Sequence, residues 1–334
     1  MFNTIVQHTE KLIANATTQP QPTIVLGLSG GPDSVFLFHV LEQLHRINAI
    51  KLVAAHLDHG WRETSAQDAL FCTKLCLRYD ITCFVARPDG SIIHNTGSLE
   101  DFGRRLRRAH FHSIAHQTQA SLIALAHHLD DQEETFFIRL IRGSSLAGLT
   151  GMREKDGLYL RPLLTTHKEE IVRYLNEHRL AYCTDSTNSS DNFLRNRLRN
   201  HVMPALRQAD QRFDQKFHTT LGMLQDEETF LQKLADQTFN KLFSQNEGVV
   251  DSPYRVHCQQ LLMLDTVIIR RVIMQWLIRE NVAFTPSSSL INEISRFLNS
   301  PRGGTHHISP TSKLCKQRGL AWIEHQPLQQ NSAV

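Results

Sequence analysis

The sequence has few cysteines and no long hydrophobic run, and these absences exclude several classes of protein. Its 334 residues include six cysteines, none of them in a C-x-x-C pair, which argues against a zinc ribbon and a disulfide framework. No uncharged apolar run approaches the ~18 residues that span a bilayer, and the first 22 residues lack an apolar core. We therefore expect a cytoplasmic protein with reduced thiols and no membrane association.

Neither sign of charge dominates, and low-complexity sequence is absent. Thirty-six Lys and Arg residues stand against 33 Asp and Glu residues, a net charge of +3, so the total alone does not indicate a nucleic-acid partner. A hydrophobic fraction of 41% with 21% charged residues is typical of a globular chain and excludes a disordered one. At roughly 150 residues per domain, the length predicts two domains.

Short β-branched runs alternate with helical spacing in the first half of the chain. The runs lie at residues 23–28, 51–57, 81–86, 121–126 and 158–160. Segments with helical apolar spacing, such as 35–44 and 66–77, lie between them. This alternation predicts a Rossmann-like α/β fold, in which helices cover both faces of a parallel sheet.

From Lys168 onward the pattern becomes helical. Helical spacing recurs at residues 169–178, 196–206, 214–243, 257–279 and 287–298. Two glycines at 303–304, followed by two short apolar stretches, predict a terminal β-hairpin. We therefore expect an α/β domain over residues 1–212 and a mainly helical domain with a small terminal β element over residues 213–334.

A glycine-rich loop joins the first predicted strand to the first apolar helix. Glycines permit a tight turn, and hydroxyls and free amides at a helix start bind phosphate. The loop matches neither G-x-x-x-x-G-K-S/T nor G-x-G-x-x-G and holds no lysine, which disfavours γ-phosphate transfer and NAD chemistry. The residues expected to bind a phosphate or pyrophosphate are Ser29, Gly30, Gly31, Pro32, Asp33 and Ser34.

Four acidic residues cluster after the fourth predicted strand. Asp131 and Glu134 are three positions apart and share one face of a helix. Asp130 and Glu133 form a neighbouring pair, turned by roughly one hundred degrees. Two carboxylates on one face can grip an ammonium group.

Two other interpretations of this segment stay open. His127, His128 and Asp130, with His56 or His59, could form a binuclear metal site, although the histidine spacing is not H-x-x-x-H. Alternatively, the acidic residues only favour the start of a helix and the histidines belong to the core.

The loop from Ser29 to Ser34 resembles the S-G-G-x-D-S loop of the N-type ATP pyrophosphatases, the PP-loop superfamily. These enzymes cleave ATP between its α and β phosphates and adenylate a substrate carbonyl. The resemblance implies ATP and Mg²⁺ as cofactors, with Asp33 helping to hold the Mg²⁺ that accompanies pyrophosphate.

Residues 126–151 resemble the signature A-H-H-x-x-D-Q-x-E-T, followed by L-x-R-G-S-x-x-x-G-L, of tRNA(Ile)-lysidine synthases. Further motifs of that family agree in order along the chain, at 56–62, 97–107, 161–164, 185–188 and 195–199. Gly103 and Arg108 stand where the family has Ala and Tyr.

This resemblance implies a ligase that joins the ε-amine of L-lysine to C2 of the wobble cytidine 34 in a tRNA(Ile) with a CAU anticodon. The reaction passes through an adenylated cytidine and changes decoding from AUG to AUA. The resemblance places lysine recognition on Arg107, Asp131 and Glu134, and catalysis on the two acids together with Asp33.

Clustered arginines point to RNA, because phosphate contacts need local positive charge. The residues expected to bind the tRNA are Arg195, Arg197 and Arg199. The alternative function is that of another adenylating tRNA-modifying enzyme, such as a tRNA thiolase, although thiolases commonly use paired cysteines. The sequence leaves the oligomeric state open, with a homodimer as one option.

Overall fold

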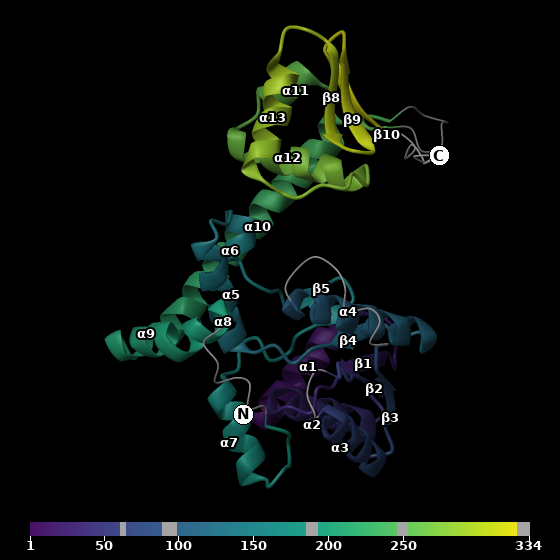
Figure 1. Cartoon of the computed structure of the whole chain (residues 1–334), viewed down its shortest axis with the longest axis vertical. Coiled ribbons are helices and arrows are strands. Elements are labelled where there is room, and N and C mark those ends of the chain that lie inside the picture. The colour runs from purple at the N-terminus through teal and green to yellow at the C-terminus, as the bar shows by residue number, and fades with distance from the viewer. Residues whose placement is uncertain (61–64, 89–98, 185–192, 246–252, 326–334) are drawn as a thin grey trace, which may run out of the picture. The chain divides into compact units, whose positions relative to one another are not determined.

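The computed structural model describes residues 1–60, 65–88, 99–184, 193–245 and 253–325. The chain forms two compact units, residues 1–222 and 223–334 (Figure 1). The helix α10 (Phe213–Leu242) begins in the first unit and continues into the second. The two units are described separately below.

A six-stranded sheet forms the centre of the first unit, in the order β3-β2-β1-β4-β6-β5. Its strands are β1 (Thr23–Gly27), β2 (Lys51–Leu57), β3 (Thr82–Ala86), β4 (Leu122–Ala124), β5 (Lys155–Asp156) and β6 (Tyr159–Leu160). Neighbouring strands are parallel except β5, which is antiparallel to β6. The predicted parallel sheet is confirmed, with one short antiparallel edge added.

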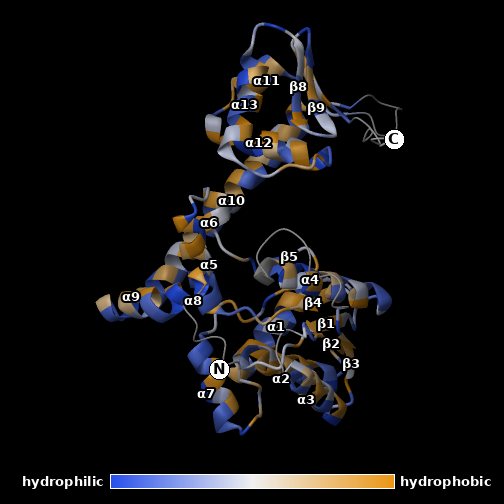
Figure 2. Cartoon of the chain, viewed as in Figure 1, coloured by the Kyte–Doolittle hydropathy of each residue, from blue (hydrophilic) through white to orange (hydrophobic). Residues whose placement is uncertain are grey.

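Helices cover both faces of this sheet. One face packs against α1 (Phe2–Ala16), α2 (Pro32–Arg46), α3 (Ser65–Arg78) and α7 (Lys168–Glu177), and the other against α4 (Leu99–Gln117). Because successive strand residues point to opposite faces, Ile24 and Leu26 enter the first core and Val25 enters the second. The central strands β1 and β4 are buried on both faces, and their buried residues are all apolar; Figure 2 colours the chain by hydropathy.

The strand β1 lies where the order of the sheet reverses. From β1 the chain passes to β2 and β3 on one side, and it returns later to β4 on the other side. In open α/β sheets ligands bind at this point, beyond the carboxyl ends of the strands. The glycine-rich loop follows β1, and the His127–His128 pair follows β4, so both predicted site segments lie at the same edge of the sheet.

The segments that follow β4 and β6 are helical. They comprise α5 (Leu129–Ile141), α6 (Leu146–Leu149), α8 (Leu194–Arg197), a π-helical turn (Leu198–Val202) and α9 (Met203–Ala209). The single helix predicted over 196–206 is therefore interrupted. Pro204 lies in the first turn of α9 and has no amide hydrogen to continue an α-helical ladder, which is why the widened turn precedes it.

The second unit packs around the fully buried Trp276. The end of α10 joins three helices, α11 (Cys258–Leu262), α12 (Thr266–Arg279) and α13 (Ser288–Asn299). An antiparallel sheet in the order β7-β10-β9-β8 consists of β7 (Arg255–His257), β8 (Gly304–Ser309), β9 (Ser312–Gln317) and β10 (Leu320–His325). Within the described ranges, no helix combines the length and apolarity needed to cross a membrane.

Two predictions for this unit need correction. The helix predicted over 257–279 is two helices, because the amide of Leu264 turns back to the carbonyl of Leu261 and Asp265 starts a new helix. Apolar residues continue through this turn, so periodicity alone does not reveal it. The predicted terminal hairpin is instead three consecutive strands, and β7 pairs with the last of them.

The close packing of Gly27 against α4 gives a test of the fold. A Cβ atom at Gly27 would stand 2.9 Å from two ring carbons of Phe111, so Gly27→Ala overpacks the second core. We expect this change to lower the free energy of unfolding by about 1 to 3 kcal/mol, measured by denaturant titration. Gly222→Ala on α10, where no atom lies within 4 Å, is the matched control and should raise stability by up to ~1 kcal/mol.

A double-mutant cycle assigns the effect to the ring. Phe111→Leu removes the ring carbons that meet the new methyl group, so Gly27→Ala should destabilise this background less than the unaltered chain, and the remaining effect comes from Leu125, whose Cδ2 atom would stand 3.0 Å from the new Cβ. Equal destabilisation in both backgrounds would contradict the contact.

Candidate active site

The loop between β1 and α2 is held in shape by its own hydrogen bonds. The hydroxyl of Ser34 accepts from the amide of Ser29 at 3.2 Å and donates to the carbonyl of Gly31 at 3.0 Å. The amide of Cys183 donates to the carbonyl of Gly30 at 2.9 Å. Gly30 has a φ of +86°, a conformation that glycine adopts without strain. The predicted position of the loop, between a strand end and a helix start, is confirmed.

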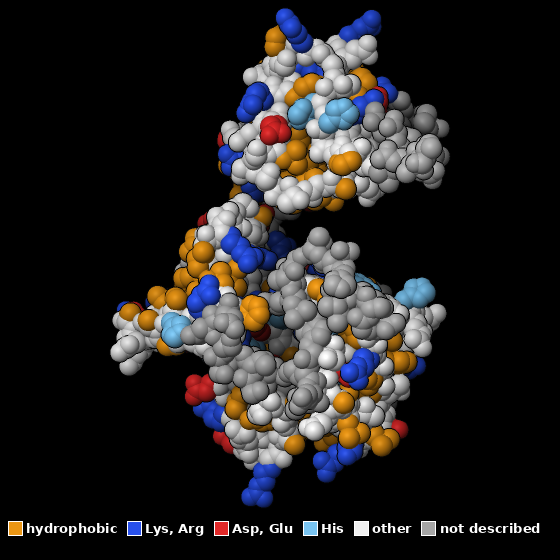
Figure 3. All heavy atoms as spheres, in the orientation of Figure 1, with side chains coloured by type: hydrophobic (Ala, Val, Ile, Leu, Met, Phe, Trp, Pro, Cys, Tyr) orange, Lys and Arg blue, Asp and Glu red, His pale blue; other side chains and the backbone are white. Residues whose placement is uncertain are grey.

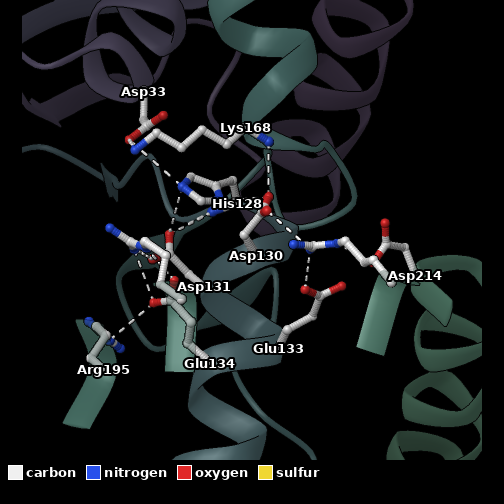
Figure 4. A network of polar contacts seen from close by, with 11 residues as sticks. Asp33, His128, Asp130, Asp131, Glu133, Glu134, Lys168, Arg195 and Asp214 are labelled. Atoms are coloured by element: carbon white, nitrogen blue, oxygen red, sulfur yellow. Dashed lines mark hydrogen bonds and ion pairs between the residues drawn. The ribbon is translucent and has the colours of Figure 1, made fainter. Parts of the chain in front are cut away.

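Asp33 lies in the first turn of α2 and faces two nitrogen groups (Figure 4). Its Oδ2 atom is 3.5 Å from Nζ of Lys168 and 3.7 Å from Nε2 of His128. Its Oδ1 atom is buried and has no hydrogen-bond partner among the residues that the structure describes. Carboxylate oxygens are ligands that Mg²⁺ prefers, so a buried, unpartnered oxygen beside a phosphate loop fits a magnesium ion held there.

The predicted pairing of Asp131 with Glu134 on one face of α5 is confirmed, and an arginine meets this face. Both carboxylate oxygens of Glu134 accept from Arg199, at 2.6 Å from Nε and 3.1 Å from Nη2. The Oδ1 atom of Asp131 is 3.9 Å from the same Nη2. Arg195 adds a contact of 3.3 Å between its Nε and Oε2 of Glu134. The face of α5 that was predicted to bind a substrate ammonium is therefore already paired with the guanidinium groups of Arg195 and Arg199.

The second pair, Asp130 and Glu133, meets a different arginine. The Nη2 atom of Arg207 is 3.3 Å from Oδ1 of Asp130 and 2.5 Å from Oε2 of Glu133. The Nε atom of Arg207 donates to Asp214 at 2.8 Å. Arg207 thus ties α9 and the first turn of α10 to α5.

The four acids of α5 differ in burial and in protonation. Burial raises the pKa of Glu133 and of Glu134, whose exposed fractions are 0% and 1%, although Arg207 and Arg199 oppose the shift. Burial also acts to raise the pKa of Asp130 and of Asp131. For the aspartates, however, interactions with His128 and hydrogen bonds from backbone amides outweigh burial and lower the pKa. The first turn of α5 therefore carries the ionised carboxylates of Asp130 and Asp131. The second turn carries Glu133 and Glu134, for which burial disfavours the charged form.

His128 lies at the centre of these carboxylates (Figure 4). Its Nε2 atom is 3.5 Å from Oδ2 of Asp131, and its Nδ1 atom is 3.4 Å from Oδ2 of Asp130. Burial alone would lower the pKa of His128, but its interaction with Asp130 and the charges of Asp131 and Asp33 raise it. The amide of His128 also donates to Asp131 Oδ2 at 3.0 Å, so this residue starts the helix as well as balancing its charge.

The described side chains do not assemble the binuclear metal site that the sequence left open. Across those ranges, no group of three or more His, Cys, Asp and Glu residues is arranged to hold a metal ion. His56 instead donates from Nδ1 to the carbonyl of Leu28 at 2.8 Å. Burial lowers the pKa of His127 to about 4.

The predicted arginines differ in how exposed they are. Arg107 and Arg197 are exposed on α4 and α8, whereas Arg195 and Arg199 contact α5. Figure 3 shows Lys and Arg side chains dispersed over the visible face. The motif positions 61–62, 97–98 and 185–188 fall outside the described residues. The roles in lysine and tRNA binding stay predictions.

Two residues of the network, Lys168 and Arg207, were not predicted from the sequence to contact the acidic helix or the phosphate loop. Lys168 occupies the first position of α7, where a basic residue opposes the helix dipole, and that mismatch was a usable signal. Arg207 carried no such signal, because its partners on α5 are 74 and 77 positions away.

Comparison with known proteins finds relatives that match most of the chain. The tRNA(Ile)-lysidine synthase of Bacillus subtilis (strain 168) is 35% identical over 312 residues, which is 90% of this chain and 64% of that protein. The corresponding enzyme of Enterococcus faecalis (strain ATCC 700802 / V583) is 32% identical over 249 residues, 73% of this chain and 52% of that protein. The chain thus spans between half and two thirds of the length of these curated relatives.

A solved structure shares the fold. The U34-tRNA thiolase NcsA from Methanococcus maripaludis, solved with its 4Fe-4S cluster, aligns with a TM-score of 0.55 at 17% identity, over 66% of this chain and 80% of that chain. The PP-loop domain family matches residues 1–206, a range that includes the glycine-rich loop, the parallel sheet and the acidic helix. The chain belongs to the PP-loop domain family.

Proposed function

We propose that the chain catalyses the ATP-dependent ligation of L-lysine to C2 of cytidine 34 in a tRNA(Ile) with a CAU anticodon. The observation that carries this proposal is the meeting of the phosphate loop and the acidic helix at one sheet edge. Asp33 from the loop and Asp131 from the helix both lie near the same atom, Nε2 of His128, at 3.7 and 3.5 Å. The names of the curated relatives, tRNA(Ile)-lysidine synthases, support the same activity.

In the first step, the C2 carbonyl oxygen of the cytidine attacks the α-phosphorus of ATP. Pyrophosphate leaves with the electron pair of the broken P–O bond, and the hydroxyls and amides from Ser29 to Ser34 receive it. Asp33 would hold a magnesium ion, which neutralises negative charge on the phosphates. The cytidine must be turned out of the anticodon loop to reach this edge, as loop bases can be.

In the second step, the ε-amine of lysine attacks C2 and AMP leaves. Asp131 suits recognition of the incoming ammonium, because its lowered pKa keeps it ionised and 15% of its side chain is exposed. Glu134, whose pKa burial raises, is better matched to accept the proton that the ammonium must lose. Arg107, exposed on α4, supplies the charge that the α-carboxylate of lysine requires.

The tRNA contacts are assigned to the arginines that border α5 and to the second unit. Arg197 is exposed, and the side chains of Arg195 and Arg199 remain 28% and 29% exposed, so all three can reach a phosphate. The second unit, residues 223–334, would bind the tRNA outside the anticodon. Ligation of lysine would then change decoding from AUG to AUA.

A tRNA thiolase is the alternative, and one observation bears on it. The Sγ atoms of Cys72 and Cys183 both lie 3.3 Å from the position that a Cβ atom would take on Gly30, so two thiols border the phosphate loop. Burial raises the pKa of Cys72, which suppresses the reactive thiolate. Mass spectrometry of the wobble nucleoside separates the two functions, since a ligase adds lysine and a thiolase adds sulfur.

Asp33→Asn should depress AMP and pyrophosphate formation by at least about a hundredfold, because it removes the carboxylate that supports the metal beside the phosphates. Affinity for tRNA should stay within about twofold. Nucleotide products after incubation with ATP, lysine and unmodified tRNA(Ile) give the first quantity, and filter binding gives the second. Asp80→Asn is the matched control, since Asp80 is exposed in a left-handed turn that Asn tolerates.

Two results would count against this reading. Stoichiometric ADP in place of AMP would reject adenylation altogether. Equal loss of product formation and tRNA binding in Asp33→Asn would indicate general misfolding instead of a local effect.

Asp131→Asn should raise the apparent KM for lysine about ten- to a hundredfold, which is the range for loss of one charge-assisted hydrogen bond. Glu134→Gln should behave differently, because it also leaves Arg199 without its charged partner and lowers the melting temperature. Lysine titration in single-turnover reactions and thermal unfolding separate the two. Asp226→Asn, an exposed position on α10, controls for the lost charge.

The adenylated tRNA provides the decisive readout for Asp131. If Asp131 recognises lysine, the intermediate accumulates or hydrolyses when lysine is limiting. Unchanged dependence on lysine together with lost adenylation would instead assign Asp131 to the metal and reject its role in recognition.

A further inference from the structure

Lys168 reaches the phosphate loop from a helix that follows the sheet (Figure 4). It is the first residue of α7, and its Nζ atom lies 3.5 Å from Oδ2 of Asp33. Its backbone amide donates to Oδ2 of Asp130 at 3.0 Å. The residue is therefore anchored at its backbone to the acidic helix, while its side chain extends to the phosphate loop.

Local structure gives no reason for a lysine at this position. The first turn of a helix favours acidic residues, and Glu169 and Glu170 follow in the same turn. The ion pair with Asp33 contributes little stability, because 35% of the lysine side chain and 24% of the aspartate are exposed. The partly exposed side chain is instead available to a ligand that reaches the loop.

The surroundings of Lys168 fix its backbone in place. Asp130, which accepts the amide of Lys168, also contacts His128 at 3.4 Å and Arg207 at 3.3 Å. This carboxylate is held from three sides, so the start of α7 has little freedom relative to α5. Because the backbone is fixed and the side chain is flexible, the ammonium group of Lys168 can stay in contact with a phosphate group that moves.

We propose that Lys168 is a catalytic residue of adenylation, whose ammonium binds the phosphate oxygens of ATP and stays with pyrophosphate as it leaves. The inference rests on the proposed function, since it needs ATP cleaved between the α and β phosphates. As the acceptor oxygen bonds to the α-phosphorus, the α–β P–O bond breaks and its electron pair passes to pyrophosphate. Lys168 meets the charge that develops there and supplies the lysine that the loop itself lacks.

A structural role for Lys168 makes a different prediction. If the lysine only orients Asp33, its loss acts through magnesium, and a saturating concentration of magnesium restores phosphate binding. If the ammonium contacts phosphate directly, magnesium does not replace it. Binding of inorganic pyrophosphate at low and at saturating magnesium distinguishes these roles, and it requires neither tRNA nor lysine.

The experiment is a calorimetric titration of inorganic pyrophosphate into the full chain and four variants. We expect Lys168→Gln to weaken binding about ten- to a hundredfold at both magnesium concentrations, and Lys168→Arg, which keeps the charge, to retain most of the affinity. Asp33→Asn should lose affinity chiefly in the presence of magnesium. Lys233→Gln, an exposed lysine on α10, should match the unaltered chain.

Full recovery of Lys168→Gln at saturating magnesium would overturn the proposal, as would unchanged affinity or an unaltered chain that binds no pyrophosphate. Thermal unfolding of each variant identifies any loss that comes from misfolding, and recovery by Lys168→Arg then shows that charge is what matters. Analysis of the tRNA product distinguishes failure of the Lys168 proposal from failure of the ligase proposal. A chain that binds pyrophosphate through Lys168 yet forms no lysidine would refute the ligase function alone.

Discussion

Four carboxylates within two turns of one helix impose the main electrostatic constraint on this protein. Like charges three positions apart repel one another on a helix, and the two glutamates of α5 are buried. The chain meets this constraint with three arginines from residues 195–207 and with His128 at the start of the helix. Removing one partner of a buried ion pair leaves an uncompensated charge, so α5 and the segment that supplies these arginines depend on each other.

This balance gives two neighbouring turns of α5 different chemical characters. The first turn benefits from the positive end of the helix dipole and from His128, and the pKa values of Asp130 and Asp131 are lowered. The second turn lies deeper, and burial raises the pKa values of Glu133 and Glu134. One short helix therefore presents an anionic rim toward the phosphate loop while it keeps a set of internal acids paired with guanidinium groups.

The sequence allows prediction of features that depend on neighbouring residues. The apolar run of β1, the glycine-rich turn after it and the shared face of Asp131 and Glu134 all depend on residues that are close in the sequence. The residues that contact these features cannot be predicted in the same way. Arg199, for example, is 65 positions from Glu134, and only the complete fold brings the two together. The break between α11 and α12 was missed for a related reason. Apolar residues continue across that turn although several of them, such as Met263 and Val267, are exposed, and hydrophobic periodicity does not distinguish exposed from buried apolar residues.

The π-helical turn at residues 198–202 determines how Arg207, which follows it, is oriented around the helix relative to Arg195, which precedes it, and Arg199, which lies within it. A π-helical turn contains about one residue more than an α-helical turn, so the helix after it is rotated with respect to the helix before it. Arg195 and Arg199 contact Glu134, and Arg207, beyond the turn, contacts Glu133. A single-residue deletion within this turn would restore a regular helix but rotate Arg207 by roughly one hundred degrees. The number of residues in this segment is therefore more tightly constrained than the identity of most of them. Homologous chains that keep both acid pairs should have the same number of residues here.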